Sequence, residues 1–172
     1  WQVIPANAFG TATGCTTIWS FTTGAASVVN STTPYSQDFE YCNDWTFVNG
    51  TQTNIWTQGS ATNNGGSQAI YISNNGGTSN AYSTGSSSIV HFYKDIAIPA
   101  GQSTILEFDW KGRGENVPIF GTPVDYMRVY DAPTSVNPVA GTEVSATYQI
   151  GTTYNNQTNF TTVRINLPES DA

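Results

Sequence analysis

Charged side chains are scarce in this sequence, and basic ones above all. Of its 172 residues only 10% are Asp, Glu, Lys or Arg, against roughly 25% in an average soluble protein. Five residues are Lys or Arg, they are scattered along the chain, and the formal net charge is −7. Because binding to phosphates requires clustered Lys and Arg, the composition excludes nucleic acid as a partner.

Long hydrophobic runs are also missing. No apolar stretch approaches the roughly 18 residues that cross a bilayer as a helix, so we expect no membrane insertion. The first predicted strand begins at Trp1 itself, with no signal peptide before it. We therefore expect the sequence to be a piece of a longer protein.

Cysteine and histidine are equally rare, and Cys15, Cys42 and His91 are the whole complement. Two cysteines allow one disulfide in an oxidising compartment, but each could instead have its partner beyond this sequence. Both alternatives stay open. No Cys-x-x-Cys spacing occurs and only one histidine is present, so a zinc site is not expected.

Uncharged polar residues and aromatics take the place of charge. Aromatics make up 13% of the chain, which favours a folded protein over a disordered one. Short runs of alternating or β-branched residues recur between turn clusters such as Asn63-Asn64-Gly65-Gly66 and Asn74-Asn75-Gly76-Gly77, and no stretch has helical periodicity. The pattern predicts an all-β sandwich or barrel. The predicted strands are Trp45–Val48, Asn54–Thr57, Ala69–Ile72, Ser88–Tyr93, Thr104–Trp110, Asp125–Tyr130 and Thr162–Leu167.

The first part of the chain has a separate pattern. Two predicted strands, Trp1–Pro5 and Trp19–Thr23, flank a turn at Asn7–Gly10 and the pair Gly14-Cys15. These segments resemble the last two strands of a bacterial fibronectin type III-like domain. The resemblance implies that residues 1–23 are a fragment of such a domain and that residues 24–34, which are small and polar, are a linker. In that family the cysteine often pairs near the domain start, which would leave Cys15 without a partner in this chain.

A second resemblance covers residues 35–172. It depends on a series of short motifs whose order and spacing match: Gln37-Asp38-Phe39-Glu40, Asp44-Trp45-Thr46, Ile55-Trp56, Ala69-Ile70-Tyr71-Ile72-Ser73, Ile89–Tyr93, Ile96-Ala97-Ile98-Pro99, Leu106–Lys111 and Asp125–Tyr130. With these motifs the segment resembles the cleaved adhesin and choice-of-anchor domains of secreted Bacteroidetes proteins, which are similar in fold to the MAM domain. The resemblance implies a jelly-roll β-sandwich carried on a large secreted or cell-surface protein.

The same resemblance implies structural calcium, which is bound by about six to eight oxygen atoms. Asp38 and Glu40 have the alternate spacing that puts both side chains on one face of a strand. Asp109 and Asp125 match acidic positions of the family's inner strands. We expect these four carboxylates to bind calcium, with Glu40 and Asp125 as the principal ligands and Asp44 as a lesser candidate. The alternative is that Asp38 and Asp109 merely face solvent.

The aromatic residues allow a second kind of site. A flat platform for sugar rings needs exposed aromatic faces, and the candidates are Trp45, Trp56, Trp110, Tyr71, Tyr82 and Tyr126. The alternative is that the tryptophans fill the core, and we favour this for Trp110 because it alternates with Phe108 and Leu106. Tyr82 lies in a stretch rich in Ser, Thr, Gly and Asn, and is the expected ligand-binding residue.

Catalysis is not expected. His91 alternates with Ile89 and Tyr93 on a predicted strand, where a packed or surface role is commoner than that of a base. Asp109 and Asp125 could form a glycosidase pair, but nothing in the sequence marks a substrate cleft. No nucleophile turn or phosphate-binding loop occurs.

Together these observations predict a non-catalytic adhesion or recognition module of an exported bacterial cell-surface protein. Its partners would be a host or neighbouring-cell protein or glycan, and it would sit beside other domains of the same chain. The 74–88 stretch and the 112–121 stretch are the expected contact loops, because loops commonly carry function. The alternatives are a carbohydrate-binding module of a secreted polysaccharide-degrading enzyme and a spacer with no ligand.

Overall fold

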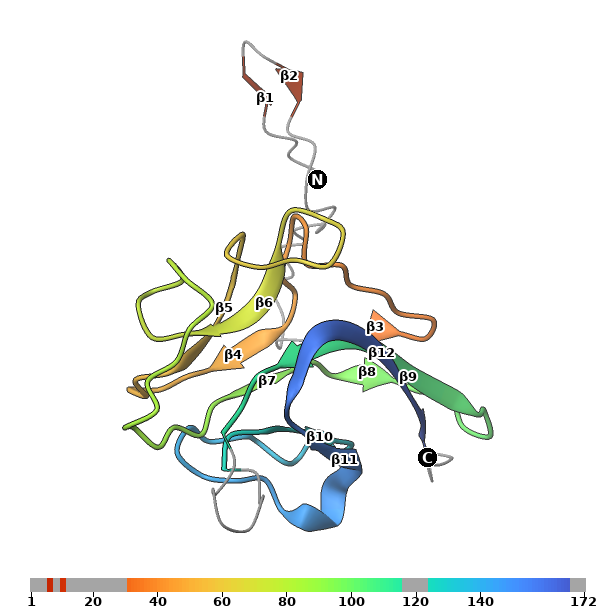
Figure 1. The fold of residues 1–172 in the computed structure, drawn as a ribbon. Coiled ribbons are helices and arrows are strands. Elements are labelled where there is room, and N and C mark those ends of the chain that lie inside the picture. Colours follow the sequence, from red (N-terminus) through yellow and green to blue (C-terminus); the bar gives the residue numbers. More distant parts are fainter. Residues whose placement is uncertain (1–5, 8–9, 12–30, 116–123, 168–172) are drawn as a thin grey trace, which may run out of the picture.

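The computed structural model describes residues 6–7, 10–11, 31–115 and 124–167, and within them it is built from β-strands. The one other regular element is a short 3-10 turn at Ala146–Tyr148. The strands are β1 (Ala6–Asn7), β2 (Gly10–Thr11), β3 (Ser31–Thr32), β4 (Thr46–Val48), β5 (Ile55–Gly59), β6 (Ala69–Ser73), β7 (His91–Tyr93), β8 (Ile96–Ala97), β9 (Thr104–Gly112), β10 (Met127–Tyr130), β11 (Gln149–Tyr154) and β12 (Gln157–Leu167) (Figure 1).

The strands pair in two nested sets. Antiparallel β4 and β7 enclose the hairpin of β5 and β6, and antiparallel β9 and β12 enclose the pair of β10 and β11. Pairs of this kind, with an inner hairpin inside an outer pair, belong to antiparallel sandwich folds. The predicted all-β sandwich class is confirmed.

The longest pair, β9 with β12, has one inner and one outer face. Along β9 the side chains of Leu106, Phe108 and Trp110 are half-buried, whereas those between them are exposed. This is the alternation expected of a sheet that covers a core on one side. On the outer face Arg164 Nη1 lies 3.1 Å from Glu107 Oε2, in an exposed ion pair that contributes at most about 1 kcal/mol. The curved β12 wraps across the front of the molecule in Figure 1.

Aromatic rings form two groups in the core. In the first, the ring of Phe92 lies 4.7 Å from Trp56 and 5.2 Å from Trp45. In the second, Tyr154 lies 5.1 Å from Trp110 and meets it edge to face. Such pairs add about 0.5–1.5 kcal/mol to the free energy gained by burying the rings. The three tryptophans therefore pack against other rings, in keeping with the core role that we favour for Trp110.

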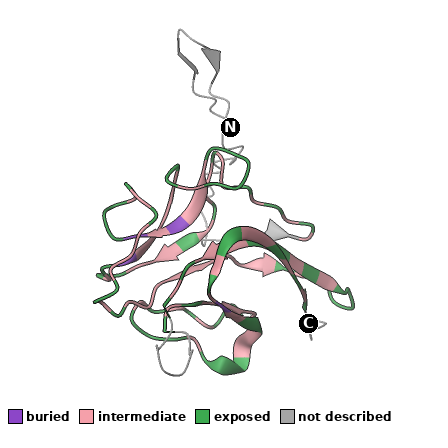
Figure 2. Cartoon of the chain, in the orientation of Figure 1, coloured by how far each residue is buried: buried purple, intermediate pink, exposed green. Residues whose placement is uncertain are grey.

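Few side chains are completely covered, and two of them are polar (Figure 2). Ser73 at the end of β6 is fully buried, and its Oγ accepts hydrogen bonds from the N–H groups of Asn75 and Gly77, 3.3 and 3.0 Å away. Asn54, also buried, accepts from Ser83 N at 2.7 Å and donates to Ser83 O at 3.2 Å. Ser73 therefore binds the beginning of the 74–88 loop, and Asn54 binds its second half. Both supply hydrogen-bond partners for backbone groups of the loop.

Apart from β1 and β2, which overlap the predicted turn at Asn7–Gly10, three strands were not predicted. The two-residue β3 and β8 pair with each other in parallel, and β3 lies in the segment predicted as a linker. Two residues are too short to give an alternation. The third, β11, is interrupted by Gly151 at φ +67°, which breaks its hydrophobic pattern.

The division of the first part of the chain stays a prediction. Trp1–Pro5 and Trp19–Thr23 lie outside the described residues. Between them β1 and β2 form an antiparallel pair in which Asn7 faces Gly10, so the chain reverses at the predicted turn. Cys42 is disulfide-bonded, but Cys15 lies outside the described part, and its pairing with Cys42 stays a prediction too.

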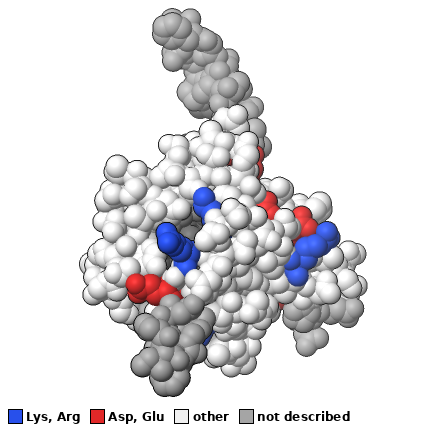
Figure 3. All heavy atoms as spheres, in the orientation of Figure 1, with Lys and Arg blue, Asp and Glu red and all other residues white. Residues whose placement is uncertain are grey.

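The surface bears few charges. On the face shown in Figure 3, acidic and basic atoms form small separate groups among uncharged ones. None of the described segments forms a helix of the length and apolar character needed to cross a membrane.

Replacing Asn54 by alanine is expected to destabilise the domain. The substitution leaves the backbone N–H and C=O of Ser83 without their partner, at a cost of about 1–3 kcal/mol. Urea unfolding measures the free-energy change. Asn137→Ala serves as the control, because the Asn137 side chain is exposed and bonds only locally to Ser135 O, 3.3 Å away. Equal effects of the two substitutions would contradict the role given to Asn54.

Candidate functional site

The two ends of the segment between β9 and β10 are hydrogen-bonded to each other at one edge of the domain. Glu115 O accepts hydrogen bonds from Val124 N at 2.8 Å and Asp125 N at 3.4 Å. Asn155, which lies between β11 and β12, donates from Nδ2 to Asp125 O at 2.5 Å. Gly114 has φ +43°, and a side chain there would collide with Asn155 and Asp125. The base of this loop, which is one of the predicted contact loops, is therefore held in a single arrangement.

Asp125 and Tyr82, predicted separately as a metal ligand and a ligand-binding residue, lie side by side at this edge. The pKa of the Tyr82 phenol is raised, first by burial and then by the charge and hydrogen bond of Asp125, with a smaller effect of Glu115. The Oδ2 atom of Asp125 is buried and has no hydrogen-bond partner among the described residues. A buried carboxylate oxygen without a donor is costly, and a cation or a ligand N–H or O–H group would satisfy it.

A second group lies next to Asp125 in the chain, at the beginning of β10. Tyr126 OH donates to Glu143 Oε1 at 3.1 Å, and Arg128 Nη1 donates to Glu143 Oε2 at 3.0 Å. The Arg128 guanidinium lies 4.5 Å from the centre of the Tyr126 ring. The pKa of Tyr126 is raised, chiefly by burial and then by its bond to Glu143. Tyr126 as a residue is nonetheless 39% exposed, so part of it is open to a ligand.

Glu40 is bound by a loop rather than left open. Ser67 N lies 2.8 Å from Oε2 and 3.0 Å from Oε1, Ser67 Oγ lies 2.5 Å from Oε2, and Gln68 N lies 3.2 Å from Oε1. The hydrogen bonds from the Ser67 hydroxyl, then from the two backbone N–H groups, lower the pKa of Glu40. A Cβ atom at Gly66 would overlap the carboxylate. This arrangement holds the β5–β6 loop, residues 60–68, against the segment before β4.

The turn that presents Glu40 has an unusual backbone. Phe39 has φ +61°, which is uncommon for a bulky residue. Side chains on both sides support it: Gln37 Oε1 accepts from Phe39 N at 2.8 Å, and Asp38 Oδ1 accepts from Glu40 N at 3.0 Å. The Phe39 carbonyl accepts from Gln58 Nε2 on β5. Asp38 therefore stabilises the turn that positions Glu40.

Asp109 is held by the same loop that binds Glu40. Its Oδ2 accepts from Asn64 Nδ2 at 2.7 Å, and its Oδ1 accepts from Thr162 Oγ1 on β12 at 2.5 Å. The β5–β6 loop thus donates to Asp109 through Asn64 and to Glu40 through Ser67 and Gln68.

The four predicted calcium ligands fall into two places. Glu40 and Asp109 adjoin the β5–β6 loop, where N–H and O–H donors bind both oxygens of each carboxylate. Asp38 lies beside Glu40 and accepts from Glu40 N through Oδ1, and Asp125 adjoins Tyr82. Within residues 31–115 and 124–167, His, Cys, Asp and Glu form no group of three that could hold a metal ion. Of the four, Asp125 fits a cation best, because Oδ2 has no donor.

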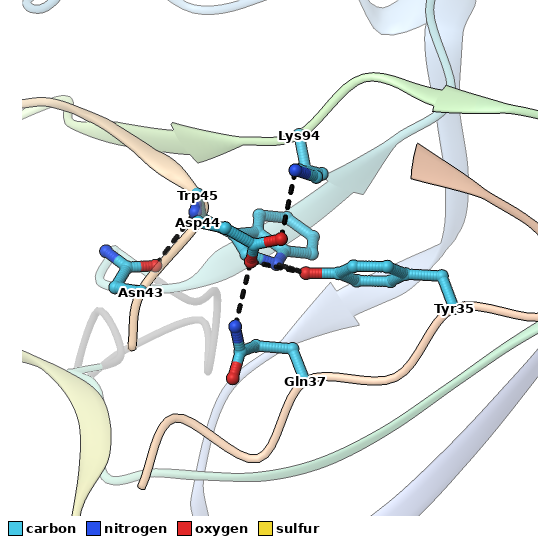
Figure 4. A network of polar contacts seen from close by, with 6 residues as sticks. All are labelled: Tyr35, Gln37, Asn43, Asp44, Trp45 and Lys94. Atoms are coloured by element: carbon cyan, nitrogen blue, oxygen red, sulfur yellow. Dashed lines mark hydrogen bonds and ion pairs between the residues drawn. The ribbon is translucent and has the colours of Figure 1, made fainter. Parts of the chain in front are cut away.

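Asp44, the lesser calcium candidate, belongs to a polar network that sequence reasoning missed (Figure 4). Tyr35 OH donates to Asp44 Oδ1 at 2.6 Å, Gln37 Nε2 donates to the same atom at 2.8 Å, and Lys94 Nζ lies 3.0 Å from Oδ2. Trp45 Nε1 donates to Tyr35 OH at 2.9 Å. Burial, then the bond to Asp44, raises the pKa of Tyr35 to about 12. Burial alone would raise the pKa of Asp44, but the bonds from Tyr35, Gln37 and Lys94 outweigh it and lower the pKa.

The remaining predicted aromatic and histidine residues have structural contacts. Tyr71 is 4% exposed, and its OH donates to Gly77 O at 2.6 Å. His91 Nε2 lies 3.2 Å from Val139 O and 2.9 Å from Thr142 O, so it carries the proton and donates to both carbonyls. Comparison of the chain with protein-family models, with curated proteins and with solved structures finds no match.

Gly66→Ala is expected to displace the Glu40 carboxylate from the β5–β6 loop, because the new methyl group would occupy its place. The expected result is a lower midpoint of thermal unfolding. Gly85→Ala is the matched control: no atom lies within 4 Å of the position that its Cβ would take, and its φ is not positive. A Gly66→Ala protein as stable as Gly85→Ala would contradict this assignment.

Acidification is expected to release the β5–β6 loop. The pKa of Glu40 is lowered from its ordinary value of 4.5, so its stabilising bonds are complete above that pH and are lost as the pH falls through the folded-state pKa. The NMR shift of the Ser67 amide should therefore titrate with a midpoint below 4.5. Glu40→Gln should abolish this titration, and a midpoint at or above the ordinary value would count against it.

Proposed function

We propose that this chain is a non-catalytic recognition module of an exported bacterial cell-surface protein, which displays rigid loops to a protein or glycan on a host or neighbouring cell. The observation that carries the proposal is that three separate loops are each bound to other segments of the domain by side-chain hydrogen bonds. Its resemblance to secreted adhesin domains, which also sit beside fibronectin-like domains, supports the setting.

Rigid loops favour recognition because less conformational freedom is lost when a partner binds. The β5–β6 loop is held by Glu40 and Asp109, and the 74–88 loop by Asn54 and Ser73. The loop before β10 is held by Asn155. In each case the holding residue lies outside its loop. Within the β5–β6 loop the side chains of Asn64 and Ser67 take part in this binding, and exposed side chains such as those of Asn63 and Ser60 face outward.

The surface suits a polar, uncharged partner. The net charge is −7, but residues 60–68 and 74–88 contain no Asp, Glu, Lys or Arg. Three basic groups are paired with carboxylates elsewhere: Lys94 with Asp44, Arg128 with Glu143 and Arg164 with Glu107. What remains on the displayed loops is mostly amide and hydroxyl. Such groups form hydrogen bonds with the backbone of a protein or with the hydroxyls of a glycan.

The proposal includes a calcium ion bound at Asp125, beside Tyr82. The unpartnered Oδ2 of Asp125 supports it, and the Glu115 carboxylate, which also acts on the Tyr82 phenol, would supply a second charged oxygen. A bound calcium ion would supply positive charge and fix these groups. Glu40 and Asp109 would then act through the β5–β6 loop rather than on the ion.

His91, the one histidine of the sequence, has a structural role. Its Nε2 donates to the carbonyls of Val139 and Thr142. The imidazole therefore joins β7 to the 139–142 segment.

A carbohydrate-binding module of a secreted polysaccharide-degrading enzyme is the second candidate. Tyr126 favours it, because a partly exposed ring flanked by Arg128 and Glu143 combines a stacking surface with hydrogen-bonding groups. The two candidates differ in ligand, not in the rigid display of loops.

Calcium is expected to raise the thermal midpoint of the protein above that in chelator. A ligand at about 100 times its dissociation constant stabilises by roughly 2.7 kcal/mol. Asp125→Asn should abolish the shift, and Glu143→Gln, at a carboxylate already paired with Arg128, should keep it. An identical midpoint with calcium and with chelator would contradict a bound ion.

Binding itself is tested on a glycan array and a panel of extracellular matrix and cell-surface proteins. Tyr82→Ala should reduce binding at least severalfold, and Tyr41→Ala, at a tyrosine 81% exposed elsewhere on the molecule, should not. Binding to proteins or to cell-surface glycans supports the adhesin, and binding only to polysaccharides of the kind that secreted enzymes degrade supports the carbohydrate module. No binding in either assay would overturn both and leave a spacer.

A further inference from the structure

Three asparagines of the described chain are followed directly by glycine: Asn49, Asn64 and Asn75. In such a pair the backbone nitrogen of the glycine can attack the side-chain carbon Cγ of the asparagine, because glycine has no side chain to obstruct the approach. The reaction requires the asparagine side chain to rotate toward the next peptide. How firmly each amide is held therefore decides which pair reacts.

Two of the three side chains are held at both ends. Asn49 Oδ1 accepts from Trp56 N at 2.8 Å, and its Nδ2 donates to Trp56 O at 2.9 Å. Asn75 Oδ1 accepts from Ser79 N at 3.0 Å and from Ser73 Oγ at 2.9 Å, and its Nδ2 donates to Ser79 Oγ at 2.9 Å. Rotation of either side chain breaks at least two hydrogen bonds.

Asn64 differs from both. It is exposed, and among the described residues its side chain makes one hydrogen bond, from Nδ2 to Asp109 Oδ2 at 2.7 Å. The next residue, Gly65, has φ +83°, and no atom lies within 4 Å of the position that a Cβ would take there. The Asn64 side chain and the Gly65 peptide nitrogen, which would react with each other, thus both belong to exposed residues.

We propose that Asn64 is a deamidation site whose conversion detaches the β5–β6 loop from β9. The bond that forms joins Gly65 N to Asn64 Cγ, and the bond that breaks is Cγ–Nδ2. The amide proton of Gly65 leaves with the amine as ammonia, which gives a cyclic imide. Water then opens the ring to aspartate or isoaspartate, so the whole reaction consumes one water and releases one ammonia.

The consequence follows from the position of Asp109. Deamidation replaces the N–H donor that binds Asp109 by a carboxylate directed at another carboxylate, and like charges at hydrogen-bond distance repel. The bonds of Ser67 and Gln68 to Glu40 are not altered by this change. The loop is therefore released at its Asn64 end and retained at its Ser67 end.

The site is tested by incubating the folded protein at mildly alkaline pH and locating deamidation by peptide mapping with tandem mass spectrometry. Asn64 should react at least severalfold faster than Asn49 and Asn75. In the urea-unfolded chain the three should react at similar rates, because the hydrogen bonds that protect two of them are gone. Equal rates in the folded protein, or a faster reaction at Asn49 or Asn75, would overturn the proposal.

The release of the loop is tested by hydrogen exchange on Asn64→Asp, which reproduces the aspartate product. Backbone amides of residues 61–66 should exchange severalfold faster than in the wild type. Asn75→Asp is the matched control, since it places the same change in another loop and keeps the acceptor bonds to Ser79 N and Ser73 Oγ; it should leave residues 61–66 unchanged. Unaltered exchange in Asn64→Asp would show that the bond to Asp109 does not hold the loop.

Discussion

The structure depends on polar side chains that satisfy the backbone of its loops. The sandwich core is shallow, and its fully covered aromatic residues are few, so apolar burial alone does not fix the segments between strands. Ser73, Asn54, Glu40 and Asn155 do so by bonding to loop N–H and C=O groups. This explains the composition: amides and hydroxyls supply donors and acceptors without the cost of burying a charge.

Carboxylates in this domain have two different environments, and the difference decides what they can bind. Glu40 and Asp109 receive hydrogen bonds from donors of one loop, and each donor occupies oxygen lone pairs that a cation would need. Asp125 has a buried oxygen that no described residue satisfies. Asp109 and Asp125 are the same residue type, and only the fold shows that the first is already bound by donors whereas the second has an oxygen without one.

Much of the fold was predictable because strand patterns are local. The alternation of Leu106, Phe108 and Trp110 correctly gave the inner face of β9, and the glycine-rich clusters correctly marked the turns beside β6. β1, β2, β3, β8 and β11 were missed, because two-residue strands and a strand with a left-handed glycine have no such pattern. The contacts of Glu40 were not predictable, since its donors are largely backbone N–H groups, which every sequence has. Tyr82 and Asp125 were chosen on separate grounds, and their proximity depends on the tertiary structure.

The nesting of β10 and β11 inside the pair of β9 and β12 has a kinetic consequence. The outer strands β9 and β12 are separated in the chain by the whole inner segment. They can therefore pair only after a long loop has closed. Proteins rich in such distant pairings fold slowly compared with those built from local hairpins. During synthesis β9 is made well before β12. Until β12 pairs with it, the backbone edge and the apolar face of β9 are exposed and can associate with other segments or chains.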